Sequence, residues 1–180
     1  IKSLSEEEIS AIENGVANER YLRDDPIRLR VHQIVWEFDN YANGGDFNGH
    51  SLVLRWVYWK TAWQILMDNW LHGVGTGDVQ AAFDAHYAAN DYNLLDQYKV
   101  RAHQQYLTMG LTFGVIGMLY FLLSLIIPMF RNTEKSFYPA FIIIVMCSML
   151  TEDTLETQIG CTFYAFFNSI VLFSLIRSRV

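Results

Sequence analysis

Three long stretches without a charged residue occupy most of the C-terminal part of the chain, and they constrain its fold more than any other feature. They are Leu107–Phe130, Ser136–Thr151 and Thr157–Ile176, with 24, 16 and 20 residues. A helix of about 20 apolar residues crosses the roughly 30 Å hydrocarbon core of a bilayer. The first and third stretches reach that length. The second is short enough to be a buried or re-entrant helix by itself, but its place between two longer stretches leads us to interpret it as the returning span.

We therefore predict an all-α, polytopic membrane protein. A mostly helical loop region at 1–106 lies outside the membrane and is followed by a transmembrane region at 107–180, with spans near 107–130, 136–151 and 157–176. The alternative is a soluble protein with three buried helices. We reject it because residues 107–180 hold only 8 charged residues, which could scarcely cover three apolar helices in water.

The net charge of −6 belongs entirely to the loop region, which holds 9 of the 13 basic residues and 15 of the 19 acidic residues. Such an acidic balance argues against nucleic acid as a partner. The two cysteines, Cys147 and Cys161, fall inside predicted spans. We interpret them as packing residues rather than as a disulfide or a metal-binding pair.

The basic residues also predict the orientation in the membrane, because cytoplasmic loops carry an excess of Lys and Arg. Segments 131–135 and 177–180 each hold two basic residues, whereas the intervening segment 152–158 holds none. Three alternating crossings then place 131–135 and 177–180 in the cytoplasm and leave 1–106 and 152–158 on the outer side. The chain starts at Ile1 without Met or a signal segment. We therefore expect the C-terminal part of a longer membrane protein, preceded by its remaining N-terminal transmembrane helices.

Residues 51–67 are predicted to form a helix with an unusual number of aromatic residues. Arg55 and Lys60 lie among Trp56, Tyr58, Trp59 and Trp63. Aromatic rings beside cations are typical of the headgroup level of a membrane. We therefore favour a helix on or near the membrane surface over an ordinary amphipathic core helix.

Three alternating glycines, Gly73, Gly75 and Gly77, are followed by Asp78. The pattern predicts a tight turn, with Asp78 as the N-cap of a helix that continues to about Ala89. The backbone N–H groups of such a turn could hold a phosphate oxygen. A purely structural turn explains the pattern at least as well, so both interpretations stay open.

The densest group of polar residues comes directly before the first predicted span. It consists of Arg101, His103, Gln104, Gln105 and Tyr106. One interpretation is a solvated turn whose Arg and Tyr anchor the chain at the membrane boundary. The other is a proton acceptor, His103, beside an anion-binding Arg101. The residues alone favour neither. The other four histidines are scattered without ligand spacing, so we do not expect a zinc site.

Three segments in this order carry a family resemblance: SLVLRWVYW (51–59), HGVGTGD (72–78) and RAHQQYLTMGLTFGVIG (101–117). Together they resemble the O-antigen ligase/polymerase superfamily of bacterial inner-membrane glycosyltransferases, over roughly residues 50–175. These enzymes carry a large periplasmic loop between late transmembrane helices, and the loop ends in a motif that contains a histidine.

The histidine motif of that family, a His separated by ten residues from a Gly, falls on His103 and Gly114. Gln104 replaces the usual Asn after the His and is an amide one methylene longer. The second loop motif, an Arg followed by three residues and a Leu, is not matched cleanly, because Trp59 stands in the Leu position after Arg55.

The resemblance implies transfer of a glycan from an undecaprenyl-diphosphate-linked donor to a sugar hydroxyl of lipid A–core, in the bacterial inner membrane. His103 would accept the proton of the attacking hydroxyl. Arg55 and Arg101 would stabilise the departing diphosphate. We expect a metal-independent, inverting reaction without a cofactor, because two guanidinium groups can replace a divalent cation. Supporting roles are expected for Gly73, Gly75, Gly77, Asp78, Gln104, Gln105, Tyr106 and Gly114.

Two kinds of alternative stay open. O-antigen polymerases and protein O-oligosaccharyltransferases of the same superfamily share the donor chemistry and differ in the acceptor. A non-enzymatic transporter or sensor would be expected to carry ionisable residues within its spans, and the three uncharged stretches contain none.

Overall fold

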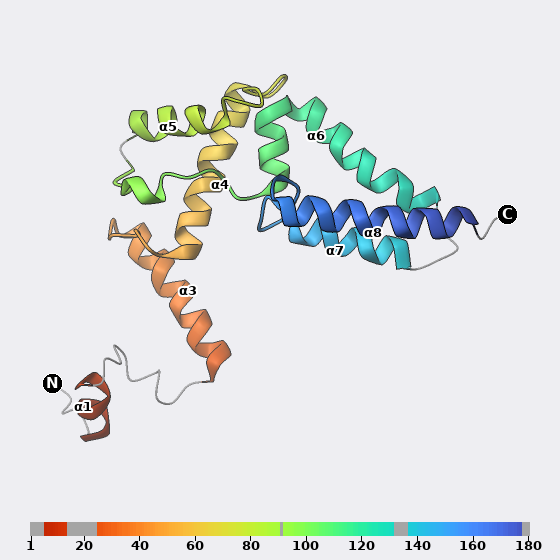
Figure 1. Cartoon of the computed structure of the whole chain (residues 1–180). Helices are drawn as coiled ribbons and strands as arrows, with labels where there is room; N and C mark the ends of the chain where they lie inside the picture. The colour runs from red at the N-terminus through yellow and green to blue at the C-terminus, as the bar shows by residue number, and fades with distance from the viewer. Residues whose placement is uncertain (1–5, 14–24, 91, 132–136, 178–180) are drawn as a thin grey trace. The chain divides into compact units, whose positions relative to one another are not determined.

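The computed structural model describes residues 6–13, 25–90, 92–131 and 137–177, and in these residues the chain is helical and has no β-strand. The predicted all-α class is confirmed (Figure 1). The α-helices are α1 (Glu6–Glu13), α3 (Pro26–Ala42), α4 (Ser51–Asp68), α5 (Val79–Asn90), α6 (Gln105–Arg131), α7 (Phe137–Ser148) and α8 (Gln158–Arg177), with short 3-10 helices η1 (Asp96–Tyr98) and η2 (Thr154–Glu156).

The chain divides into two compact units, residues 1–53 and residues 54–180. The structural boundary therefore falls inside α4, well before the boundary at residue 106 that separates the predicted loop region from the predicted spans. The two divisions describe different properties, packing in one case and charge in the other. The division into loop and membrane regions stays a prediction.

In the first unit, Pro26 opens α3 at the first helical position, where its missing N–H costs nothing. The loop after α3 is held by Asn40, whose side-chain amide donates to the Asp46 carbonyl at 2.7 Å. The rings of Trp36 and His50 meet edge to face at 5.3 Å. The candidate site residues chosen from the sequence begin at Arg55, so none of them lies in this unit.

The aromatic helix predicted at 51–67 is confirmed as α4, most of which belongs to the second unit. α5 begins at Val79 and buries Val79, Phe83 and Tyr87, which are one helical turn apart and so share a face. His86 of α5 lies 3.1 Å from the Gln64 side chain of α4. This contact joins α5 to the C-terminal half of α4.

The apolar core of the C-terminal helices combines residues from three helices. α6 contributes Leu125, α8 contributes Val171, and α7 contributes most of the buried side chains: Tyr138, Phe141, Ile142 and Val145. Aromatic packing extends this core, since Phe141 stacks on Tyr164 at a centroid distance of 6.3 Å. The three helices therefore form one packed bundle.

A break in α6 at Gly114 is the main departure from a simple spanning helix. Gly114 has φ 69° and ψ −175°, a conformation that favours glycine. The N–H of Val115, which the break releases from the helix, donates to the Trp70 carbonyl at 2.8 Å. A Cβ atom on Gly114 would collide with the Leu71 carbonyl. The chain after α4 thus packs backbone to backbone against the broken helix.

The glycine turn supplies the other half of this junction. Val74 N–H donates to the Leu111 carbonyl at 2.7 Å, and Gly75 N–H donates to the Thr112 carbonyl at 3.1 Å. Gly73 has φ 69°, and a Cβ atom there would collide with Leu111. The two carbonyl groups freed by the kink in α6 are therefore satisfied by the turn, as buried backbone groups must be.

Helix lengths decide how much of the predicted membrane layout the structure supports. Gln105–Phe130 is long and apolar enough to cross a membrane, and only 11% of its most apolar window is buried within the protein, unlike a core helix of a soluble protein. α7 has 12 residues, a length of about 18 Å. The last residues of the predicted second span, 149–151, form a turn and not a helix. One candidate span is established by length and composition, and the three-span layout is not confirmed. Residues 132–136 and 178–180 lie outside the described residues.

Candidate active site

The polar segment 101–103 is held by a contact with α4 and by the start of α6. Gln104 is the N-cap of α6, and its side-chain oxygen accepts a hydrogen bond from Leu107 N–H at 2.6 Å. The Trp59 indole N–H of α4 donates to the Ala102 carbonyl at 3.2 Å. The amide that follows the histidine therefore starts the helix, which explains why Gln104 can stand where the family pattern has Asn.

His103 presents a half-exposed ring from a left-handed backbone, with φ 48°. Its Nδ1 lies 3.9 Å from Asp153 Oδ2, too far for a hydrogen bond but close enough for electrostatic attraction. Asp153 is only 10% exposed, and its other oxygen accepts a hydrogen bond of 2.7 Å from the Thr108 hydroxyl. Asp153 therefore lies on the Nδ1 side of the ring, and Nε2 is the ring nitrogen on the other side.

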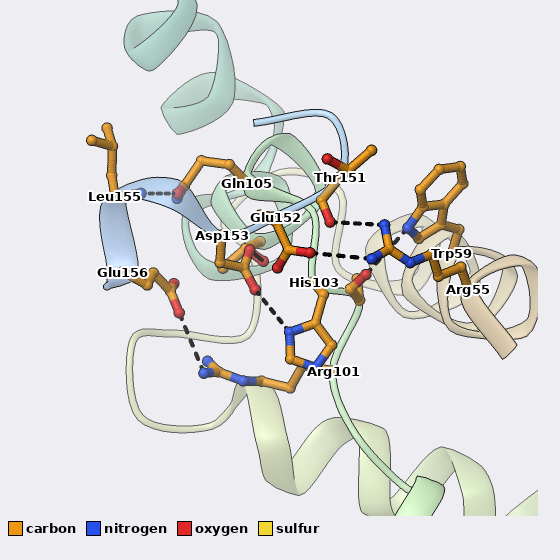
Figure 2. Close-up of polar contacts among 12 residues, drawn as sticks. Arg55, Trp59, Arg101, His103, Gln105, Thr151, Glu152, Asp153, Leu155 and Glu156 are labelled. Carbon is orange, nitrogen blue, oxygen red and sulfur yellow. Dashed lines mark hydrogen bonds and ion pairs between the residues drawn. The ribbon is translucent and has the colours of Figure 1, made fainter. Parts of the chain in front are cut away.

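Arg55 extends from α4 to the same turn, one helical turn before Trp59. Its guanidinium donates to the Thr151 carbonyl at 3.1 Å and pairs with the Glu152 carboxylate at 3.1 Å. Figure 2 shows Arg55 and Trp59 side by side on one helix, both directed at this cluster. The Trp in place of the family's Leu thus holds the segment before His103, while the Arg one turn earlier holds the turn after α7.

Arg101 reaches the far end of the same turn. Its guanidinium lies 3.3 Å from the Glu156 carboxylate. Arg55, Arg101 and His103 are therefore brought together by one short acidic turn, residues 151–156, which runs between α7 and α8 (Figure 2). We call this turn the acidic turn.

Sequence reasoning did not select the acidic turn as functional. Its three acidic residues are Glu152, Asp153 and Glu156. Each pairs with one of the three predicted site residues, although about 50 to 100 residues of chain separate the partners. A signal was present, since 152–158 is an acidic gap without Lys or Arg that the topology prediction places on the same side as the loop region.

Gln105 holds the acidic turn, and Tyr106 holds the end of α7 that precedes it. The Gln105 side-chain oxygen accepts a hydrogen bond from Leu155 N–H at 2.7 Å, and its backbone N–H donates to the Met149 carbonyl at 3.1 Å. Tyr106 donates from its hydroxyl to the Met146 carbonyl of α7 at 2.7 Å. The start of α6 therefore fixes the backbone of the turn.

The glycine turn has a structural explanation. The N–H groups of Gly73, Val74 and Gly75 all donate to carbonyl groups of the protein, so they are not available to a phosphate oxygen. Asp78 occupies the N-cap position of α5, as predicted, and its carbonyl accepts from Ala82 N–H at 2.9 Å. Gly114, the second residue of the histidine motif, belongs to the same junction.

Two buried tyrosines of this unit are unsuited to accept a proton. Burial raises the pKa of Tyr58 to about 12, with a smaller contribution from Tyr98. Burial also raises the pKa of Tyr87, whose hydroxyl donates to the Val100 carbonyl at 2.9 Å. Both phenols are therefore protonated at neutral pH. Among the described residues, no group of three or more His, Cys, Asp or Glu side chains is arranged to hold a metal ion.

Comparison with known proteins gives one match. The family model described as O-antigen ligase covers residues 15–122, more than half of the chain. It includes Arg55, Arg101, His103 and Gly114 and ends before the acidic turn. No curated protein and no solved structure matches the chain. The histidine motif lies within the matched region. The chain belongs to the O-antigen ligase family, within the O-antigen ligase/polymerase superfamily.

Proposed function

We propose that this protein transfers an O-antigen-type polysaccharide from undecaprenyl diphosphate to a sugar hydroxyl of lipid A–core. The observation that carries the proposal is the meeting of Arg55, Arg101 and His103 on one turn. Family membership supports glycan transfer of the ligase or polymerase type. Two cations beside a histidine suit a reaction in which a weak nucleophile displaces a diphosphate.

In the proposed reaction, His103 Nε2 accepts the proton of the acceptor hydroxyl as its oxygen attacks the anomeric carbon of the donor sugar. A new carbon–oxygen bond forms, and the bond from the anomeric carbon to the diphosphate breaks. The electron pair leaves with undecaprenyl diphosphate. Attack opposite the leaving group inverts the anomeric centre. Asp153 positions the imidazole, in the way that a buried carboxylate orients a catalytic histidine.

Arg55 and Arg101 stabilise the charge that develops on the diphosphate. Guanidinium groups bind phosphate oxygens through paired hydrogen bonds, and these bonds are strongest for charged acceptors. The proposed reaction needs no metal, because the two cations act where a divalent ion would otherwise act.

The proposed location is the bacterial inner membrane, with residues 1–106 and 152–158 in the periplasm. The contacts of Arg55 and Arg101 with the acidic turn support this arrangement, because both partners of each pair must lie on one side of the membrane. The donor and acceptor lipids would approach from the bilayer, with the aromatic face of α4 near the surface.

Replacement of the base tests the proposal. His103→Ala should abolish attachment of glycan to lipid A–core, measured on gels of lipopolysaccharide from cells, while the amount of protein in the membrane stays normal. His32→Ala is the matched control, since it removes a histidine from the first unit and should leave attachment unchanged. Normal attachment by the His103 variant would show that this residue is not the base.

The intermediate that accumulates without the protein separates ligase from polymerase. Deletion of the gene should leave polymerised glycan on undecaprenyl diphosphate if the protein is the ligase. A polymerase would instead leave single repeats, and these would be transferred to lipid A–core by another enzyme. That second outcome would reassign the acceptor and keep the chemistry of the site.

A further inference from the structure

The charges of the candidate site do not favour a diphosphate as they stand. The cluster contains two cations, Arg55 and Arg101, and the three carboxylates of the acidic turn. If His103 is counted as neutral, the net charge of the cluster is 2 − 3 = −1. An incoming diphosphate would meet net repulsion, because like charges at contact distance disfavour binding. Either the arginines do not bind the diphosphate or some carboxylates give way to it.

The three carboxylates differ in how firmly they are held. Asp153 is 10% exposed and accepts a buried hydrogen bond from Thr108. Glu152 is 61% exposed and Glu156 is 31% exposed, and their arginine partners are each more than a third exposed. Pairs of this exposed kind are weak, since water screens them and two long side chains must be ordered to form them. The glutamates are therefore displaceable, whereas Asp153 is not.

The backbone of the acidic turn is anchored independently of the glutamates. Leu155 N–H binds the buried Gln105 side chain at 2.7 Å, and Asp153 binds Thr108 at 2.7 Å. Rotation of the Glu152 and Glu156 side chains can thus free Nη2 of each arginine, while Nη1 of Arg55 stays on the Thr151 carbonyl and the turn keeps its place. Side-chain rotation of this kind takes place in picoseconds to nanoseconds, much faster than catalysis.

We infer, on the basis of the proposed function, that Glu152 and Glu156 are internal counter-ions that exchange with the diphosphate of the donor. Each carboxylate oxygen contacts Nη2 of its arginine, a donor that can equally serve a phosphate oxygen. The diphosphate replaces them because it offers several charged oxygens to the guanidinium forks at once. When the reaction is complete, the glutamates compete with undecaprenyl diphosphate for the arginines and so promote its release.

Inorganic pyrophosphate tests this exchange as a competitor of the donor in transfer assays with membranes that contain the protein. Glu152→Gln and Glu156→Gln remove the competing charge and keep the shape of the side chain. Each should lower the inhibition constant of pyrophosphate about two- to fivefold, the range expected for loss of a weak exposed ion pair. The KM for the lipid-linked donor should fall in the same variants, and kcat should not rise.

Asp96→Asn is the matched control. It removes one carboxylate from an exposed residue of η1 that pairs with Lys99 at 2.7 Å, outside the cluster. The inhibition constant should be unchanged. An equal decrease in this variant would mean that the general field of the acidic loop region acts, and not exchange at the arginines, and it would overturn the inference.

Other outcomes separate failure of the inference from failure of the proposed function. If the glutamates only position the arginines, the Gln variants will raise the inhibition constant or leave it unchanged, and exchange is then refuted. Arg55→Ala and Arg101→Ala should raise it. If these two variants leave inhibition and donor KM unchanged, or if pyrophosphate does not inhibit the wild-type protein, the arginines do not bind the diphosphate, and the proposed function and the inference both fail.

Discussion

The two halves of α6 come from one uncharged stretch of sequence and yet have opposite surroundings. Before the break at Gly114, the helix buries three polar side chains: Gln105, Thr108 and Thr112. After it, the helix exposes large apolar ones: Ile116, Leu119, Tyr120, Leu123, Ile127 and Phe130. A buried polar group needs hydrogen-bond partners, and each of these three makes at least one hydrogen bond.

The difference assigns a separate task to each half. The first half is a scaffold, because it holds the acidic turn, orients Asp153 toward His103 and receives the glycine turn at its end. The second half presents exposed apolar side chains of the kind expected of a membrane-spanning helix. Gly114 is the residue that allows one helix to carry out both tasks.

The most damaging substitution should be one at the break itself. Gly114→Ala places a Cβ atom against the Leu71 carbonyl and imposes a left-handed backbone on an alanine. The junction with the chain after α4 must then open, and the first half of α6 loses its orientation. We expect transfer to fall below detection in cells, with a reduced amount of folded protein in the membrane.

Gly110→Ala is the control for Gly114→Ala. Gly110 lies in the first half of α6. A Cβ atom added there would lie 3.3 Å from Leu66 Cδ2, the flexible end of that side chain. Transfer should stay within about twofold of wild type, since alanine is favoured over glycine in a helix. Equal loss in both variants would show that the whole first half is intolerant of added volume and that the break has no special role.

A smaller effect is expected from the polar contact that holds Asp153. Thr108→Val removes the hydroxyl that donates to this buried carboxylate at 2.7 Å. An unsatisfied buried acceptor costs about 1–3 kcal/mol, so Asp153 should shift and leave His103 less well oriented. We expect kcat to fall about tenfold, with the KM for donor unchanged.

Two variants check that the lost hydroxyl is the cause. Thr108→Ser keeps the donor and should recover most of the transfer rate. Thr112→Val removes a hydroxyl that only bonds back to the Thr108 carbonyl at 2.7 Å, and it should leave kcat near the wild-type value. A fall in donor affinity in Thr108→Val, with kcat unchanged, would assign this contact to donor binding and not to orientation of the histidine.

The sequence predicts the elements of this molecule better than their junctions. The aromatic helix at 51–67 and the helix after Asp78 are found at α4 and α5, because helix formation and a capping residue such as Asp78 depend on neighbours in the sequence. The break at Gly114 is not local. It depends on carbonyl and N–H groups of residues 70–75, and a single glycine in an apolar stretch does not indicate such a partner.

The candidate site shows the same limit. The histidine motif and the two arginines can be chosen from the sequence, because their chemistry suits a diphosphate donor. Their pairing with the acidic turn could not be predicted, since Arg55 and Glu152 are 97 residues apart and meet only when α6 and α7 have folded. The glycine turn is a related case, because Val74 and Gly75 donate their N–H groups to carbonyl groups of α6, a pairing that the glycine spacing does not indicate.

A pair of substitutions that should leave transfer unchanged tests the surroundings of the second half of α6. Leu123 of the second half and Leu95 of the loop region are similarly exposed, at 51% and 54%. In a background without the free thiols of Cys147 and Cys161, Leu95→Cys should react with a membrane-impermeant maleimide in intact membranes, and Leu123→Cys should not. Lipid excludes the charged reagent from position 123, and detergent or denaturant should make both positions reactive. Rapid labelling at 123 in the intact membrane would place the second half of α6 in water, and its interpretation as the membrane-spanning half would then be wrong.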